Sequence, residues 1–259
     1  MHSPPFLQRI VGYSSAELPS AFPILPTTPM TQKKLDEEAF GLLRRIVEAN
    51  AWRQYLGANI LGHCIKMVGD LEGKRGVMND INQCLDFFAE LDDMYTNLGG
   101  ENLDVAVRDR LLNVPMPKSR FELGLCRYMT DRAQRVALAS YKDSVCKPFS
   151  ELARVHLARD SAVNETEFAR MSEFCSEPSN TPHVQQIFDQ WLTLSLLALG
   201  RPDSNGDRRA VEMGLRNENA GVLIGQYLAE MEVLAKSWGL RLPSPDRIPI
   251  DLPKTVLRV

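Results

Sequence analysis

The chain has 259 residues, of which 44% are hydrophobic and 24% charged, and its formal net charge is -3. These values are ordinary for a folded globular protein, and the lack of a general basic field argues against nucleic acid as a partner. The longest apolar run, at residues 191–200, is about half of the roughly 20 residues that a membrane-spanning helix needs. The first 30 residues show no signal-peptide pattern. We therefore expect a cytoplasmic protein that makes no membrane contact.

Five cysteines are dispersed along the chain, and none belongs to a Cys-x-x-Cys pair. An odd, scattered set of cysteines within helical patterns predicts buried thiols in a reducing compartment. Neither a disulfide framework nor a zinc site is indicated. The five are Cys64, Cys84, Cys126, Cys146 and Cys175.

Prolines are frequent near both ends of the chain. They recur through residues 1–32 and again through residues 240–259. Because proline fixes the backbone and removes an amide donor, both segments are predicted to be extended arms without regular helix or strand. Residues 33–239, which lie between the arms, are predicted to form one helical domain.

The first half of this domain predicts two long helices. Apolar residues recur at helical spacing from residue 33 to about residue 70, and Gly57 and Gly62 are the positions where this helix is expected to bend or break. A turn is expected at residues 69–74. The next helix, over residues 79–98, buries one side and ends at Gly99, because glycine readily adopts the left-handed conformation that stops a helix.

Further helices follow from local signals. Ser119 and Glu122 have the spacing of a capping box, which predicts a helix over residues 120–140. No stretch shows the period-two alternation of a strand, so the predicted fold class is all-α. The other expected helices are at 103–112, from a cap at Asp143 or Ser144 to about 162, at 166–175, at 183–199 and at 211–238.

The motifs that are absent narrow the range of functions. The chain has no glycine-rich phosphate loop, nucleophile elbow or His-Glu-x-x-His motif, so most hydrolase, nucleotide-binding and zinc functions lose support. Di-iron carboxylate bundles carry Glu-x-x-His on two of their helices. None of the four histidines here follows a glutamate by three residues. An intact site of that type is therefore excluded.

Three stretches carry a resemblance to a known family. They are Pro148-Phe149 with Ala153, the segment QQIFDQWLTLSLLALGRPDS at 185–204, and the segment EMEVLAKSWGLRLPSPD at 230–246. Over roughly residues 35–246 the chain resembles the catalytic-type subunit of bacterial phenylacetyl-CoA ring epoxidase. The resemblance implies a ferritin-like bundle, oxygen insertion into an aromatic acyl-CoA at a di-iron centre, and assembly into a multi-subunit complex. It makes an acyl-CoA or carrier-bound small molecule, and a homo- or hetero-oligomer, the expected partners.

The family's iron ligands do not carry over to this chain. Only two carboxylates remain, both histidines are missing, and two hard iron ions need more anionic and imidazole ligands than this. We therefore predict no di-iron centre, no other metal and no cofactor. In helix order the ligand positions fall on Gln54, on Cys84 and Phe87, on Asp131, and on Asp160 and Val163.

Polar residues remain on the inward face and are candidates for metal-free acid and base chemistry. Asp160 follows His156 by one helical turn, and a buried His-Asp couple can exchange a proton near neutral pH. The alternative is structural: Asp131 pairs with Arg135, and Asp160 with His156 or Arg159. Cys84 has no base near it in sequence that would activate its thiol. The candidate catalytic residues are Asp131, His156 and Asp160, and the candidate pocket residues are Gln54, Cys84, Phe87, Tyr128, Arg135 and Val163.

Two groups of basic residues could bind the phosphates of a CoA or carrier-protein arm. Their alternative role is a solvated surface. The groups are Lys142, Lys147, Arg154 and Arg159, and separately Arg201, Arg208 and Arg209.

Three functions remain open. The chain is a pseudo-enzyme that scaffolds a catalytic subunit, or a metal-free pocket for an acyl thioester or related hydrophobic metabolite, or a di-iron monooxygenase whose ligands lie elsewhere. If it is an enzyme, metal-independent acid/base chemistry is favoured. A core in which Phe87 fills the former metal position supports the scaffold, whereas an open cavity lined by Gln54, Asp131 and Asp160 supports the pocket.

Overall fold

The computed structural model describes residues 37–108, 114–244 and 248. Every regular element in these residues is helical and none is a strand, which confirms the all-α prediction. The predicted arm at residues 1–32 lies outside the described residues, as does most of the predicted tail. None of the described helices is both long enough and apolar enough to cross a membrane.

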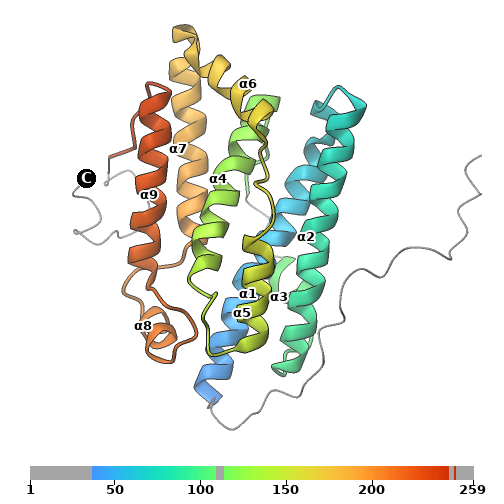
Figure 1. Cartoon of the computed structure of the whole chain (residues 1–259), viewed down its shortest axis with the longest axis vertical. Helices are drawn as coiled ribbons and strands as arrows, with labels where there is room; N and C mark the ends of the chain where they lie inside the picture. The colour runs from blue at the N-terminus through green and yellow to red at the C-terminus, as the bar shows by residue number, and fades with distance from the viewer. Residues whose placement is uncertain (1–36, 109–113, 245–247, 249–259) are drawn as a thin grey trace, which may run out of the picture. The chain divides into compact units, whose positions relative to one another are not determined.

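Helices α1 (Glu37–Cys64) and α2 (Leu71–Asn97) lie side by side as an antiparallel pair (Figure 1). The expected break in α1 is wrong, since the helix continues through both glycines to the short 3-10 turn η2 (Ile65–Met67). Gly57 instead allows α1 to pack closely against α2. A Cβ atom at Gly57 would stand 3.2 Å from the sulfur of Cys84 on α2, so its absence lets the two helices approach closely.

The start of α2 lies eight residues before the predicted start, and the turn before it is correspondingly shorter than expected. Asp70 is the reason, because its carboxylate accepts a hydrogen bond of 2.7 Å from the amide of Gly73 and caps the first turn. The predicted end is confirmed. Leu98 is the C-cap, and Gly99 has a φ of 79°.

Helix α4 (Arg120–Ala139) is the centre of the described bundle. It packs against α1, α5, α6, α7 and α9, while the short helix α3 (Leu103–Arg108) packs against α1 and α2. The predicted capping box is present: the Ser119 hydroxyl accepts from the Glu122 amide at 3.1 Å, and the Glu122 carboxylate accepts from the Lys118 amide at 2.7 Å. The same carboxylate accepts from the indole N–H of the buried Trp191 at 3.3 Å, which ties the start of α4 to α7.

Helix α5 (Lys147–Leu157) is shorter than predicted at both ends. Its N-cap is Cys146, and Pro148 lies in the first turn as expected. It ends at Leu157, because Arg135 of α4 donates hydrogen bonds to the carbonyls of Leu157, Arg159 and Asp160 at 3.2, 2.7 and 2.7 Å. These bonds satisfy carbonyls that the end of a helix leaves without partners. Residues 158–164 therefore form a loop, and Asp160 does not lie on a helix.

The last third of the chain forms α6 (Glu165–Ser176), the turn η4 (Pro178–Asn180), α7 (Thr181–Ala198), α8 (Asn205–Glu212) and α9 (Ala220–Ser237). The prediction of one helix over 211–238 is wrong. Gly214 has a φ of 68°, and the Asp207 carboxylate, paired with Arg216, accepts from the amide of Ala220 at 3.0 and 3.2 Å. The side chain of Asn219 accepts from the amide of Val222 at 3.0 Å and caps the first turn of the new helix, which the buried pair supports. Gly239, with a φ of 67°, ends α9 as predicted.

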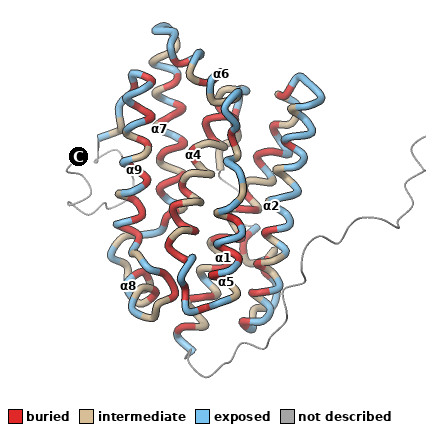
Figure 2. Tube along the Cα trace, viewed as in Figure 1, coloured by how far each residue is buried: buried red, intermediate tan, exposed pale blue. Residues whose placement is uncertain are grey.

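Burial is uneven across the described helices. The core lies around α4, α7 and α9, where Trp191, Phe188 and Tyr227 are fully buried (Figure 2). The cysteines are free thiols, all buried except Cys84, which is half-buried. Helix α2 contributes little to the core, and most of its length faces solvent. Its buried residues are Val77, Phe87, Leu91 and Met94.

Candidate functional site

An aromatic stack occupies the place where the family resemblance puts a histidine ligand. Phe87 of α2 is 1% exposed, and its ring lies on the imidazole of His156 from α5, with ring centres 3.3 Å apart and planes inclined by 12°. His156 is itself 7% exposed. The two rings therefore fill the space between α2 and α5 with side-chain atoms.

The hydrogen-bonding partner of His156 is Glu90 of α2. The imidazole Nε2 lies 3.2 Å from a carboxylate oxygen of Glu90. The expected couple with Asp160 is replaced, because α5 ends at Leu157 and Asp160 is exposed in the following loop. Burial lowers the pKa of His156, although the bond to Glu90 acts in the opposite direction. The imidazole is therefore neutral at pH 7.

The stability of the protein is expected to depend on the titration of His156. Its pKa in the folded protein lies below the ordinary value of 6.5, so the unfolded chain binds more protons as the pH falls through that value. The free energy of unfolding of the wild type should therefore fall between about pH 7 and about pH 5 more steeply than that of His156→Gln. Denaturant unfolding across this range measures the difference.

The matched control for this experiment is His183→Gln, because His183 is exposed on α7. That variant should keep the pH dependence of the wild type. The groups that face His156 are Glu90 and Arg159, and both remain in all three proteins. Equal pH dependence in the wild type and His156→Gln would contradict the prediction.

Asp131 is held by two hydrogen bonds. The guanidinium of Arg135 donates to its carboxylate at 3.1 Å, and the hydroxyl of Ser161 donates to the same oxygen at 3.2 Å. Since Arg135 also binds the end of α5, this carboxylate lies within a group of contacts that fixes the loop at residues 158–164. The contacts match the structural alternative for Asp131.

The other predicted pocket residues lie in packed surroundings. Burial raises the pKa of Cys84 to about 12, so its thiol stays protonated and is a poor nucleophile. Burial also raises the pKa of Tyr128, whose ring centre is 5.3 Å from that of Phe168. Val163 is 6% exposed and belongs to the core. Gln54 is 4% exposed, and its amide nitrogen has no hydrogen-bond partner within the described residues.

An ion cluster beside these residues was not expected from the sequence. Arg127 of α4 donates to the carboxylate of Glu167 on α6 at 2.9 Å, and it also binds the carboxylate of Asp80 on α2 and the carbonyl of Ala162. The Arg127 side chain is 13% exposed. Burial raises the pKa of Asp80 even with Arg127 beside it. The position of Arg127, four residues before Asp131, was the one sequence signal that placed it on this face.

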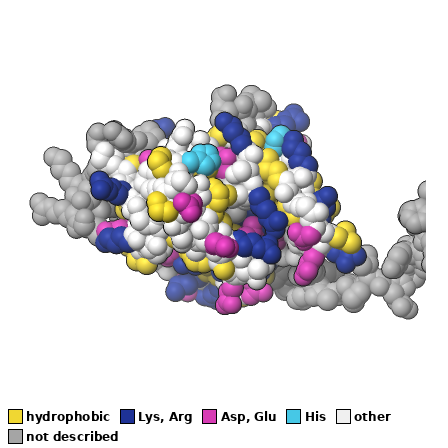
Figure 3. All heavy atoms as spheres, turned by 90° about the horizontal axis from the view of Figure 1, so that it is seen from above, with side chains coloured by type: hydrophobic (Ala, Val, Ile, Leu, Met, Phe, Trp, Pro, Cys, Tyr) yellow, Lys and Arg dark blue, Asp and Glu magenta, His cyan; other side chains and the backbone are white. Residues whose placement is uncertain are grey.

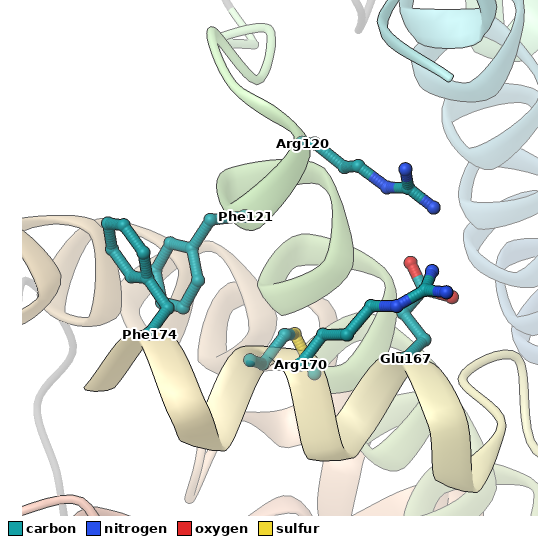
Figure 4. Close-up of a pocket in the computed structure, with 6 residues that line it drawn as sticks. Arg120, Phe121, Glu167, Arg170 and Phe174 are labelled. Atoms are coloured by element: carbon teal, nitrogen blue, oxygen red, sulfur yellow. The ribbon is translucent and has the colours of Figure 1, made fainter. Parts of the chain in front are cut away.

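A small cavity lies near this cluster, between α4 and α6 (Figure 4). Its volume is about 200 Å³, smaller than the roughly 300–1,000 Å³ typical of ligand pockets. The rings of Phe121 and Phe174 pack together with centres 4.6 Å apart. The cavity does not coincide with the predicted pocket, since its lining residues are Arg120, Phe121, Glu167, Arg170, Met171 and Phe174.

Carboxylates compete with phosphate for part of the predicted phosphate-binding surface. Acidic and basic side chains are mixed on the face seen in Figure 3. Two of the predicted phosphate-binding arginines are already paired: Arg154 with Asp143 at 3.0 Å, and Arg209 with Glu38 at 2.7 Å. Groups of three or more His, Cys, Asp or Glu side chains suited to a metal ion do not occur among the described residues.

The residues thus divide into two sets. Phe87, His156 and Glu90 join α2 to α5, while Arg127 and Arg135 use their charges to hold α2, α4, α6 and the loop between α5 and α6. The resemblance described above depends on the quoted stretches alone. No protein-family model matches this chain, and no curated protein matches it either.

Proposed function

We propose that the chain is a ferritin-like bundle, related in layout to the phenylacetyl-CoA epoxidase subunits, that acts as a metal-free structural subunit of an oxygenase-type complex. The stack of Phe87 on His156 carries this proposal. A fully buried ring stands where the resemblance would put a histidine ligand, and a packed core suits a scaffold better than a reaction chamber.

The charges around the stack support the same function. Arg127 binds the carboxylates of Asp80 and Glu167, and Arg135 binds that of Asp131. Of these carboxylates, Asp131 is the one that the resemblance puts at a ligand position, and the positive charge of each guanidinium repels a cation nearby. The carboxylates of Asp80, Glu167 and Asp131 are thus engaged in contacts between parts of the bundle.

A metal-free pocket for an acyl-CoA or a related hydrophobic metabolite is the second candidate. One observation favours it: the buried amide nitrogen of Gln54 has no acceptor within the described part of the chain. A buried donor without a partner costs about 1–3 kcal/mol. The carbonyl of a bound thioester would satisfy this donor.

Elemental analysis and native mass spectrometry of the purified full chain test these functions together. The protein should carry neither iron nor a small molecule, both as isolated and after anaerobic incubation with ferrous iron. A stoichiometric pair of iron ions would overturn the proposal and favour a di-iron monooxygenase. A copurified acyl thioester would overturn it in favour of the pocket, and Gln54→Leu should then lose that ligand.

A further inference from the structure

The outer face of α2 carries a regular row of exposed apolar side chains. Leu71, Met78 and Leu85 are 67%, 47% and 49% exposed. Residues seven apart lie nearly two full turns apart, so the three side chains project from one side of the helix. This side is opposite the buried Phe87 and Leu91, and in Figure 2 exposed positions run along α2 at the margin of the bundle. An ordered apolar row on an edge helix is typical of an interaction surface.

Charged residues flank this row, with basic residues at one end of the helix and acidic residues at the other. Lys74 and Arg75 lie near the start of α2, and Asp92 and Asp93 lie near its end. Eighteen residues make five turns of about 3.6 residues, so Lys74 and Asp92 lie on one flank and Arg75 and Asp93 on the other. Each flank is therefore basic at one end and acidic at the other. All four side chains lack an ion pair within the described residues.

We infer that a second copy of this chain binds this face, with the two α2 helices antiparallel about a two-fold axis. An axis that passes α2 near residues 83 and 84 brings Lys74 opposite Asp92 of the second copy. The same axis brings Arg75 opposite Asp93 of the second copy. Because the symmetry repeats every contact, both flanks gain two ion pairs from one arrangement. A parallel arrangement would bring Lys74 beside Arg75 of the second copy and Asp92 beside Asp93, where like charges repel.

The apolar row fits the same axis. Met78 lies opposite Ala89 of the second copy, and Leu85 lies opposite Asn82, so a large side chain meets a smaller one at each level. Burial of the apolar row supplies the affinity. The exposed ion pairs add little affinity but fix the direction and register of the two helices. The dimer does not depend on the proposed metal-free function, because it uses the face of α2 opposite Phe87.

Sedimentation velocity of the full chain over a concentration series tests the dimer. The wild type should form dimers, and Leu85→Glu should raise the dimer dissociation constant by about a hundredfold or more. The control is Val233→Glu, because Val233 is an apolar residue that is 71% exposed on α9. Val233→Glu should leave the dissociation constant unchanged. Circular dichroism establishes that both variants remain helical.

Charge reversal tests the direction of the helices. Lys74→Glu combined with Arg75→Glu should raise the dissociation constant about two- to tenfold. Adding Asp92→Lys and Asp93→Lys to the same chain should restore it, since every pair then has opposite charges again.

Several results would overturn the inference. They are a wild type that stays monomeric, a dimer that Leu85→Glu does not weaken, and a dissociation constant that the combined charge reversals do not restore. Hydrogen exchange that shows α2 protected in a monomer would assign this face to another segment of the same chain. The iron content of the protein does not affect the measured dissociation constant. The dimer and the metal-free function are therefore tested independently.

Discussion

Replacing Arg127 with methionine is expected to lower the free energy of unfolding by about 3 kcal/mol. The change leaves the carboxylates of Asp80 and Glu167 without their cation. Both side chains are only 24% exposed, so water replaces the lost cation poorly. Burial already raises the pKa of Asp80 with Arg127 present, so the site is costly for a charge. The effect is placed at the low end of the range for buried pairs, because the carboxylates keep some contact with water. Denaturant unfolding measures it.

Arg132→Met on the same helix is the matched control. Arg132 pairs with Glu230 at 2.8 Å, but both side chains are 36% exposed. Its loss should cost less than about 1 kcal/mol, because exposed ion pairs contribute little. Adding Asp80→Asn to Arg127→Met should recover part of the lost stability, since it removes one stranded charge. Equal costs for the two arginine variants would contradict the role given to Arg127.

Replacing Phe87 with alanine is expected to lower the free energy of unfolding by about 3–5 kcal/mol. The ring is 1% exposed and stacks on His156, so its removal leaves a cavity between α2 and α5. Relaxation of the surroundings is limited, because α1 and α2 approach closely one turn before Phe87, where a Cβ atom at Gly57 would stand 3.2 Å from the sulfur of Cys84. Thermal and denaturant unfolding measure the loss.

The neighbouring Phe88 provides the control. Phe88 is half-buried and packs on Tyr55 with ring centres 5.9 Å apart. Phe88→Ala should therefore cost less than Phe87→Ala. If the two substitutions cost the same, Phe87 does not fill the centre of this interface. A Phe87→Ala variant that becomes able to bind iron would show that the aromatic ring alone had excluded the metal.

The sequence predicted features of the fold whose signals lie within one helical turn. The capping box at Ser119 and Glu122 and the left-handed glycines Gly99 and Gly239 lie where expected, because each depends on neighbours only a few residues away. The all-α class followed from the same kind of local periodicity.

Tertiary contacts act at two of the boundaries that the sequence misplaced. Arg135 ends α5 from another helix, and the pair of Asp207 and Arg216 holds the start of α9, where Asn219 is the local cap. The spacing of apolar residues continues past both points, so periodicity alone extended each helix too far. When a side chain from another helix ends a helix, as Arg135 ends α5, the local spacing of apolar residues does not reveal that end.

The candidate site shows the same division. From the resemblance, the sequence predicted that Cys84 and Phe87 stand where the family has Glu-x-x-His. Only the tertiary structure decided the partners: Glu90 for His156, 66 residues away, and Asp80 for Arg127, 47 residues away. The physical reason is that pairing across helices depends on their packing and rotation, whereas sequence spacing places side chains only on the face of their own helix.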